Sequence, residues 1–202
     1  ACAPFRRLHV CDKNIQQIKT ENITTHNLLV DVCLAAKFEG QSIRGYYPRY
    51  DEQYPGSGSD FSMCTMLARS FADIGDIIRG KDLFIGNNKR DKLQEQLQKY
   101  FNKIYHGLTD SGAKKHYEGD YPNYYKLRED WWNANRQEIW KAITCSAKGY
   151  QYFRATCGSN ENTATLAKDK CRCENTSDNV NIVPTYFDYV PQYLRWFEEW
   201  AE

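Results

Sequence analysis

The chain has 202 residues, 41% of them hydrophobic and 26% charged, and its formal net charge is +1. This length can bury one substantial core without a metal, and the near-neutral charge argues against a general attraction to nucleic acid. No apolar run approaches the ~20 residues of a membrane span. The eight cysteines indicate disulfides formed in an oxidising compartment. Because the chain starts without Met and stops inside an amphipathic pattern, we expect it to be a piece of a larger protein.

The first eleven residues favour an irregular, crosslinked segment over a helix, because they hold two cysteines and Pro4. Arg6 and Arg7 in this segment could bind an anion. Pairing with local carboxylates or carbonyls is the commoner role of such arginines.

The first long helix is predicted over residues 25–39, where apolar residues share one stripe. The stripe residues are Leu29, Val32, Cys33 and Ala36. Gly40 is expected to end this helix. From there to Asp60 the sequence holds two prolines, three glycines and four tyrosines, which predicts an exposed loop.

The central helix is predicted over residues 60–79, the longest apolar-periodic segment, with Asp60 as its cap and Gly80 as its terminator. Its apolar face is formed by Phe61, Cys64, Ala68, Phe71, Gly75 and Ile78. Arg69, Asp73, Asp76 and Arg79 lie off this face. The two aspartates have the spacing of a solvated helix face, so they give no specific support for acid–base catalysis.

Residues 75–81 satisfy the phosphate-loop pattern G-x-x-x-x-G-K, but Asp82 stands where Ser or Thr would bind magnesium. A phosphate loop follows a strand and opens a helix, whereas this pattern closes a predicted helix. We therefore interpret it as a helix end and not as a nucleotide site.

The clearest amphipathic helix is predicted over residues 91–107. At 100° per residue, Lys92, Lys99 and Lys103 fall within about 60° of one another and roughly opposite the apolar stripe. We call these three lysines the basic ridge. Both a solvated helix face and an anion-binding surface fit this pattern.

Other basic residues extend the ridge or compete with it. Lys89 and Arg90 extend it at the helix start. The competing basic residues are Arg6, Arg7, Lys114 and Lys115.

Two more helices are predicted, over residues 121–145 and 191–201. Apolar side chains cover more than half of the first, so it should be packed on several sides. Trp140 lies off its apolar face and is expected to be covered by another segment. Residues 149–180 lose periodicity and are expected to form a long loop pinned by disulfides. The predicted fold class is therefore all-α, a disulfide-linked helical bundle with long irregular loops and negligible strand content.

No catalytic or metal-binding pattern stands out in the sequence. The four His residues sit in no metal spacing, and Cys171 and Cys173 form only a Cys-x-Cys pair. A zinc site made from this pair and distant cysteines is the alternative to disulfides. No local base is available to activate a Cys nucleophile. We therefore expect no enzyme activity, no metal and no cofactor.

Five long segments of the chain resemble a known family. They are CAPFRRLHVCD, LLVDVCLAAKFEG, ARSFADIGDIIRGKDLF, DWWNANRQEIWKAITC and VPTYFDYVPQYLRWFEEWAE. In this order they are similar to the Duffy-binding-like domain, alpha class, of the variant erythrocyte membrane protein that malaria parasites display on infected red cells. The resemblance implies three disulfide-linked helical subdomains, of which residues 1–59 are part of the first and residues 60–202 the second. The third is absent.

The resemblance also implies adhesion: a virulence-associated variant surface antigen, outside the infected erythrocyte and attached to the membrane only through its parent protein. The implied partners are host red-cell or endothelial receptors, including proteins of complement-receptor type, together with heparan-sulfate-like or blood-group glycans. Neighbouring domains of the same protein are also implied partners. Cytoadhesion and rosetting are the implied activities. The basic ridge, with Lys89 and Arg90, is the candidate surface for sulfated glycan. The alternative is an architectural spacer with no ligand of its own.

The resemblance further implies that Cys64 bridges to the loop after the Trp-rich helix, with Cys157 preferred over Cys145. The cysteines expected to pair among themselves are Cys33, Cys145, Cys171 and Cys173. Cys2 and Cys11 resemble family cysteines whose partners lie upstream, so no bond between them is expected.

Overall fold

The computed structural model describes residues 2–53, 63–84, 89–148, 155–157, 164–167, 169–173 and 183–201. The helices are α1 (Phe5–Leu8), α2 (Lys13–Gln16), α3 (Thr25–Gln53), α4 (Met63–Arg79), α5 (Lys89–Gly107), α6 (Ser111–His116), α7 (Tyr125–Ile143) and α8 (Gln192–Ala201). Short 3-10 helices lie at Thr20–Asn22 (η1) and Phe187–Tyr189 (η3). Strands β1 (Ala155–Cys157) and β2 (Thr165–Leu166) pair antiparallel. The predicted all-α fold is confirmed.

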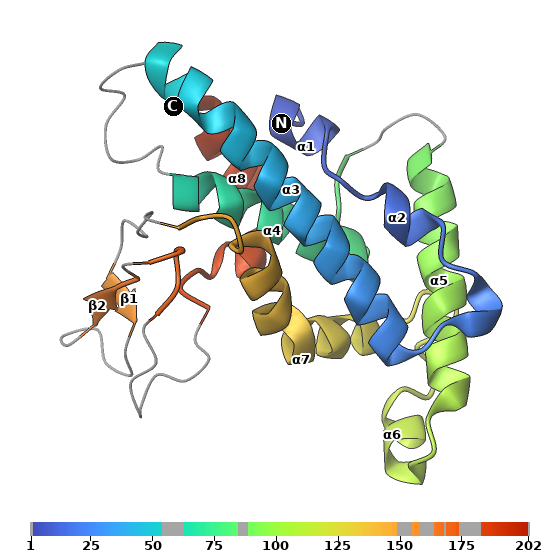
Figure 1. Cartoon of the computed structure of the whole chain (residues 1–202). Coiled ribbons are helices and arrows are strands. Elements are labelled where there is room, and N and C mark those ends of the chain that lie inside the picture. Colours follow the sequence, from blue (N-terminus) through green and yellow to red (C-terminus); the bar gives the residue numbers. More distant parts are fainter. Residues whose placement is uncertain are drawn as a thin grey trace.

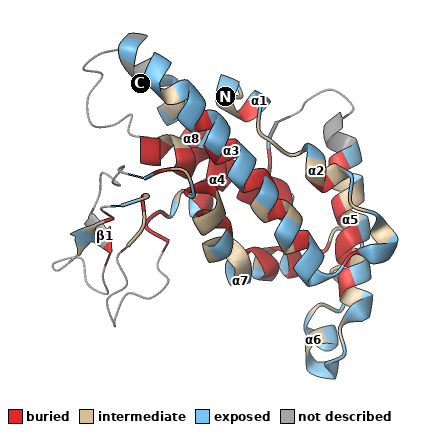
Figure 2. Cartoon of the chain, in the orientation of Figure 1, coloured by how far each residue is buried: buried red, intermediate tan, exposed pale blue. Residues whose placement is uncertain are grey.

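The core lies where α3, α4 and α7 pack together (Figure 1). The central helix α4 is buried on all sides, because every one of its residues except Met66 is buried (Figure 2). Aromatic rings fill the crossing with α7. The Phe71 ring contacts the Trp132 ring at 5.0 Å and the Trp140 ring at 5.2 Å between centroids. Trp140 is buried, which confirms that another segment covers it.

The helix predicted over residues 25–39 is longer than expected, because α3 continues through Gly40 and Pro48 to Gln53. The predicted loop is therefore wrong over residues 41–53, and its remainder lies outside the described residues. Gly40 does not end the helix. A Cβ atom there would lie 2.0 Å from the backbone oxygen of Ile143, so glycine allows α3 and α7 to cross closely.

The other predicted helices lie near their expected bounds, with residues 60–62 outside the described part of the chain. Gly80 ends α4 as predicted, with a φ of 75°. The N–H of Lys81 donates to the carbonyl oxygen of Asp76 at 2.8 Å, the bond of a Schellman motif. At the start of α7, the Asp120 carboxylate accepts hydrogen bonds from two free helix N–H groups.

Disulfides Cys64–Cys171 and Cys157–Cys173 pin the segment that follows α7. Cys64 does bridge to this segment, as expected. The prediction of Cys157 as its preferred partner is wrong, because Cys64 bonds to Cys171. The indole N–H of Trp140 donates to the Cys171 carbonyl oxygen at 3.1 Å, and this contact helps to place Cys171 beside the core. Because Cys171 and Cys173 are both in disulfides, the zinc alternative is excluded.

The remaining cysteines that the structure describes are free thiols. The prediction that Cys33, Cys145, Cys171 and Cys173 pair among themselves is therefore wrong, because the first two are free and the other two bond to Cys64 and Cys157. Cys2 and Cys11 form no bond with each other, as expected.

A cluster of buried ion pairs joins α4 to both ends of the described chain. Asp73 is fully buried and pairs with Arg6 at 2.7 Å and with Arg195 at 2.9 Å. Arg195 also pairs with Asp76, which in turn pairs with Arg79 at 2.9 Å. The interpretation of Asp73 and Asp76 as a solvated face is therefore wrong, because their partners come from α1 and α8.

Two further contacts extend this cluster. Arg6 binds the Glu199 carboxylate through two nitrogens, at 2.8 and 3.0 Å. Arg7 pairs with Asp82. Pairing with carboxylates, the commoner role expected of both arginines, is confirmed, but the carboxylates are distant in sequence and not local.

Burial and pairing act in opposite directions on the pKa values of the two buried aspartates. Burial raises the pKa of Asp73, but Arg6 and Arg195 lower it more, so it lies below its ordinary value. For Asp76, burial outweighs the lowering by Arg195 and Arg79, and its pKa is raised. Ionised Asp73 therefore stabilises the fold at neutral pH, and this contribution is lost as the pH falls through its lowered pKa. The contribution of Asp76 to the stability of the fold has the opposite pH dependence. It is present at acid pH and is lost as the pH rises through the raised pKa.

Gly40→Ala is expected to lower the free energy of unfolding by about 1–3 kcal/mol, because the added methyl group overlaps the Ile143 backbone. Gly45→Ala in the same helix is the matched control. Nothing lies within 4 Å of its added Cβ, so better helix propensity should stabilise the fold by about 0.5–1 kcal/mol. Urea unfolding measures both. Equal effects of the two substitutions would contradict a close crossing at Gly40.

Asp73→Asn is expected to lower the free energy of unfolding by about 3–5 kcal/mol at pH 7, because Arg6 and Arg195 lose their shared carboxylate. The difference from the unsubstituted protein should shrink as the pH falls below 3.8, since Asp73 itself becomes protonated. Denaturant unfolding at a series of pH values measures this, with Glu95→Gln at an exposed position of α5 as the control. A difference that does not vary with pH would show that the charge of Asp73 is not responsible.

Candidate glycan-binding surface

Helix α5 is held in a fixed position by hydrogen bonds on two sides. The hydroxyl of Tyr100 lies 3.0 Å from the carbonyl oxygen of Ile15 and 2.8 Å from that of Ile18, which ties α5 to α2. Towards α7, the amide of Asn102 donates to the Tyr124 hydroxyl at 2.6 Å. The apolar stripe of α5 is buried, as its periodicity predicts. The outer face is therefore presented by a rigid support.

The three lysines of the basic ridge are exposed on this outer face. None of their ammonium groups forms an ion pair or hydrogen bond with a residue that the structure describes. Lys89 and Arg90 lie in the first turn of α5, but their side chains lie outside the described part. The row is thus available for an anionic ligand, and binding by it stays a prediction.

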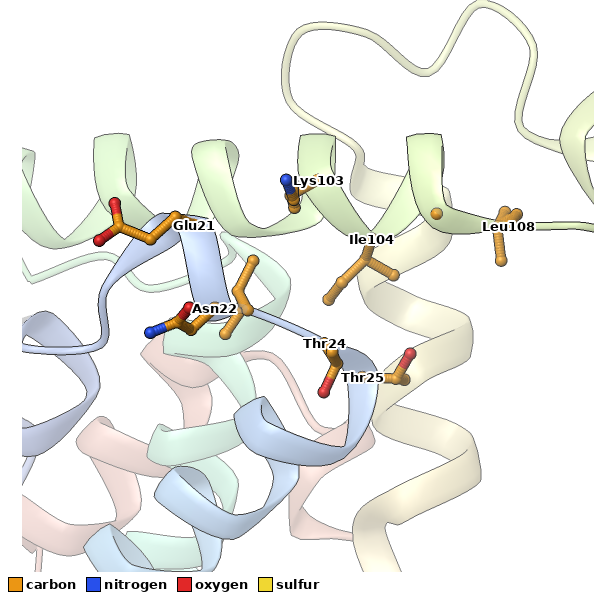
Figure 3. A pocket seen from close by; sticks show the side chains of 9 residues that line it. Glu21, Asn22, Thr24, Thr25, Lys103, Ile104 and Leu108 are labelled. Atoms are coloured by element: carbon orange, nitrogen blue, oxygen red, sulfur yellow. The ribbon is translucent and has the colours of Figure 1, made fainter.

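One flank of the ridge is covered by the η1 segment, which sequence reasoning did not place. Gln96 falls among the three lysines, and its amide donates to the Thr20 hydroxyl at 2.9 Å. No local pattern connects these residues, because 76 positions separate them in the chain. The contact places the acidic η1 residue Glu21 near the end of the ridge at Lys103 (Figure 3).

A shallow depression of about 440 Å³ lies beside Lys103 (Figure 3). Its other lining residues are Glu21, Asn22, Ile23, Thr24, Thr25, Ile104, Gly107 and Leu108. It combines one acidic and one basic side chain, so by itself it has no preference for an anion. An extended anionic chain is better matched to the ridge than to this depression.

The competing basic residues are in two different situations. Arg6 and Arg7 are occupied by carboxylates and cannot serve an external anion. Lys114 and Lys115 are exposed on α6, which projects from the bundle beyond the end of α5 (Figure 1). The described residues therefore leave two exposed cationic surfaces of interest, the basic ridge and α6.

No helix among the described residues has the length and apolar character needed to cross a membrane. Within the same residues, no group of three or more His, Cys, Asp or Glu side chains is placed to hold a metal ion.

The model of the Duffy binding domain family matches residues 1–195. The chain belongs to the Duffy-binding domain family. The resemblance noted in the sequence is therefore confirmed. A comparison with curated proteins found no match.

Solved structures agree with this family. One of them is the NTS-DBL1(alpha-1) domain of Plasmodium falciparum membrane protein 1 (PfEMP1) from the varO strain. It is 48% identical to this chain, with a TM-score of 0.76. The match covers 100% of this chain and 43% of the chain of the relative. Another is the DBLβ domain of PfEMP1 IT4var13, which was solved bound to ICAM-1. It is 32% identical to this chain, with a TM-score of 0.72, and the match covers 100% of this chain and 44% of the chain of the relative. The chain thus spans less than half the length of these relatives.

Erythrocyte Binding Antigen 140 of Plasmodium falciparum shares the fold, with 22% identity, a TM-score of 0.57, and coverage of 99% of this chain and 25% of its own.

Proposed function

We propose that this chain is part of a non-catalytic adhesion module of a variant surface protein on malaria-infected erythrocytes. Its basic ridge contributes to binding sulfated glycan on the host cell. Membership of the Duffy-binding domain family supports the first part, together with 48% identity to a PfEMP1 domain. The second part is supported by the three exposed lysines of the basic ridge, whose ammonium groups have no ion-pair or hydrogen-bond partner in the described part of the chain.

The geometry of the ridge suits a sulfated polysaccharide. The rise of an α-helix is 1.5 Å per residue, so Lys92 to Lys103 form a row about 16 Å long. Sulfates repeated along one chain can meet several ammonium groups of such a row at once. Each lysine offers a flexible point charge, so single contacts are weak and salt-sensitive, and affinity comes from engaging several sulfates together.

The receptor class is the second element of the proposal. One relative was solved bound to ICAM-1, a protein receptor, so a protein partner is compatible with this fold. For this chain we propose host red-cell or endothelial receptors that carry sulfated or blood-group glycans, or receptors of complement-receptor type. An architectural spacer without a ligand remains the alternative.

Reversing Lys92, Lys99 and Lys103 together to Glu is expected to weaken heparin binding about tenfold at 0.15 M salt. The estimate assumes about 0.5 kcal/mol for each exposed contact. Elution from a heparin column against salt, with the helical circular-dichroism spectrum as a folding check, measures the effect. Heparin from which sulfates have been removed should bind neither protein.

The matched control reverses Lys13, Lys37 and Lys148, which are exposed on other parts of the molecule. Both triple variants change the formal net charge from +1 to −5, because each Lys→Glu change removes one positive charge and adds one negative charge. Equal retention of the two variants would show that the ridge is merely solvated. Loss of binding only on reversal of Lys114 and Lys115 would assign the site to α6.

A further inference from the structure

Gly107 stands on α5 where one more lysine would continue the basic ridge. It follows Lys103 by one helical turn, about 40° around the helix and about 6 Å along its axis. A glycine brings no side chain, and a Cβ atom added there would have nothing within 4 Å. The row of charges therefore continues into a hollow, because Gly107 lines the depression beside Lys103 (Figure 3).

The depression offers neutral polar groups beside apolar side chains. Ile23 and Ile104 in its lining are buried, and Leu108 is half-buried. Asn22 and Thr25 are exposed, and their side chains have no hydrogen-bond partner among the residues that the structure describes. An amide and a hydroxyl group can bond to the hydroxyl and acetamido groups of a sugar, while the apolar side chains can contact a methyl group.

Glu21 gives the depression a negative charge on the side of the η1 segment. Its carboxylate is exposed and forms no ion pair with a described residue. A sulfate group in the depression would meet this like charge, whereas a sulfate group on the ridge meets lysines. The depression therefore favours an uncharged sugar unit, although it directly follows three cationic positions.

We propose that the basic ridge and the depression together bind a sulfated glycan at the point where its sulfation stops. The sulfated units lie on the three lysines of the ridge. The next glucosamine, which carries an N-acetyl group in place of sulfate, lies in the depression. The volume of about 440 Å³ is within the range of small-ligand sites and is large enough for one sugar unit. This inference rests on the proposed glycan binding by the ridge and adds which kind of chain the ridge selects.

The first experiment measures the affinities of three heparan-sulfate-type hexasaccharides at 0.15 M salt by titration calorimetry. One is sulfated on every glucosamine. The other two each carry one unsulfated N-acetylglucosamine, nearest the non-reducing or the reducing end. One of these two should bind about threefold more tightly than the fully sulfated hexasaccharide, because its unsulfated unit fits beside Glu21. Attraction to the ridge alone predicts the opposite order, since the fully sulfated hexasaccharide carries more charge. Tightest binding of that hexasaccharide overturns the proposal.

Glu21→Gln tests the source of the preference, because it removes the charge and keeps the size of the side chain. The fully sulfated hexasaccharide should bind about threefold more tightly to this variant, and the preference for the N-acetylated one should vanish. The control is Glu52→Gln, which changes the net charge equally at the other end of α3 from the depression. Equal effects of the two substitutions show that Glu21 acts only through net charge and overturn the proposal.

Gly107→Phe tests the depression itself, because a phenyl ring there occupies the space of the sugar. Affinity for the preferred hexasaccharide should fall about threefold, and affinity for the fully sulfated one should stay the same. Gly45→Phe on α3 is the matched control, since an added Cβ atom there also has nothing within 4 Å. The helical circular-dichroism spectrum checks the fold of both variants. Unchanged affinity of the Gly107→Phe variant for the preferred hexasaccharide contradicts the proposal.

The triple variant of Lys92, Lys99 and Lys103 separates this inference from glycan binding by the ridge. Suppose that the triple variant binds all three hexasaccharides more weakly, and that the unsubstituted chain prefers the fully sulfated one. The ridge then binds glycan, and only the role of the depression is wrong. If the unsubstituted chain binds none of the three, both proposals are wrong.

Discussion

The buried ion pairs around Asp73 are the interaction on which the rest of the structure depends. A charged group that is removed from water needs an oppositely charged partner. Arg6 and Arg195 meet this requirement for one carboxylate on α4, although 189 positions of sequence separate them. The N-terminal segment and α8 therefore cannot leave α4 independently without exposing a buried charge. A contact at their far ends supports this, because the Trp200 indole N–H donates to the Cys2 carbonyl oxygen at 2.8 Å.

This arrangement separates the parts of the molecule that hold it together from those that face outwards. Arg6 and Arg7 pair with carboxylates inside the protein. The three lysines of the basic ridge have no ion-pair partner among the described residues, and they lie on a helix fixed by Tyr100 and Asn102. For the proposed adhesion role, such a division leaves the surface free to contact a receptor while the ion-pair cluster and the two disulfides hold the fold. The same division is seen in α8, where Gln192 and Arg195 are buried while Tyr193, Phe197 and Trp200 are exposed.

Much of the fold was predictable from periodicity, and the failures have identifiable causes. The apolar stripes of α5 and α7 gave helices close to their observed bounds, and Trp140, which lies off the apolar face of α7, is buried under another segment as expected. The prediction that Asp73 and Asp76 face solvent was wrong, because helical spacing shows which residues share a face but not whether a charged partner comes from elsewhere in the chain.

The prediction that Gly40 ends a helix was wrong, because the sequence does not distinguish a glycine that ends a helix from one that permits a close crossing of two helices. Disulfide partners depend on the path of a long loop without periodicity, so Cys171 could not be selected over Cys157. For the basic ridge, exposure was predictable, whereas the contact of Gln96 with Thr20 was not.

Hydrogen exchange in an Arg6→Gln variant tests most directly whether the two ends of the chain are coupled through α4. Arg6 and the α8 residues 192–201 are far apart in sequence, so a purely local effect of the substitution would be confined to the first eleven residues. Coupling through Asp73 and Glu199 predicts about tenfold or more faster exchange in α8 as well, because the helix loses part of the network that holds it. Unchanged exchange in α8, with acceleration limited to the N-terminal segment, would contradict the central role of the buried cluster.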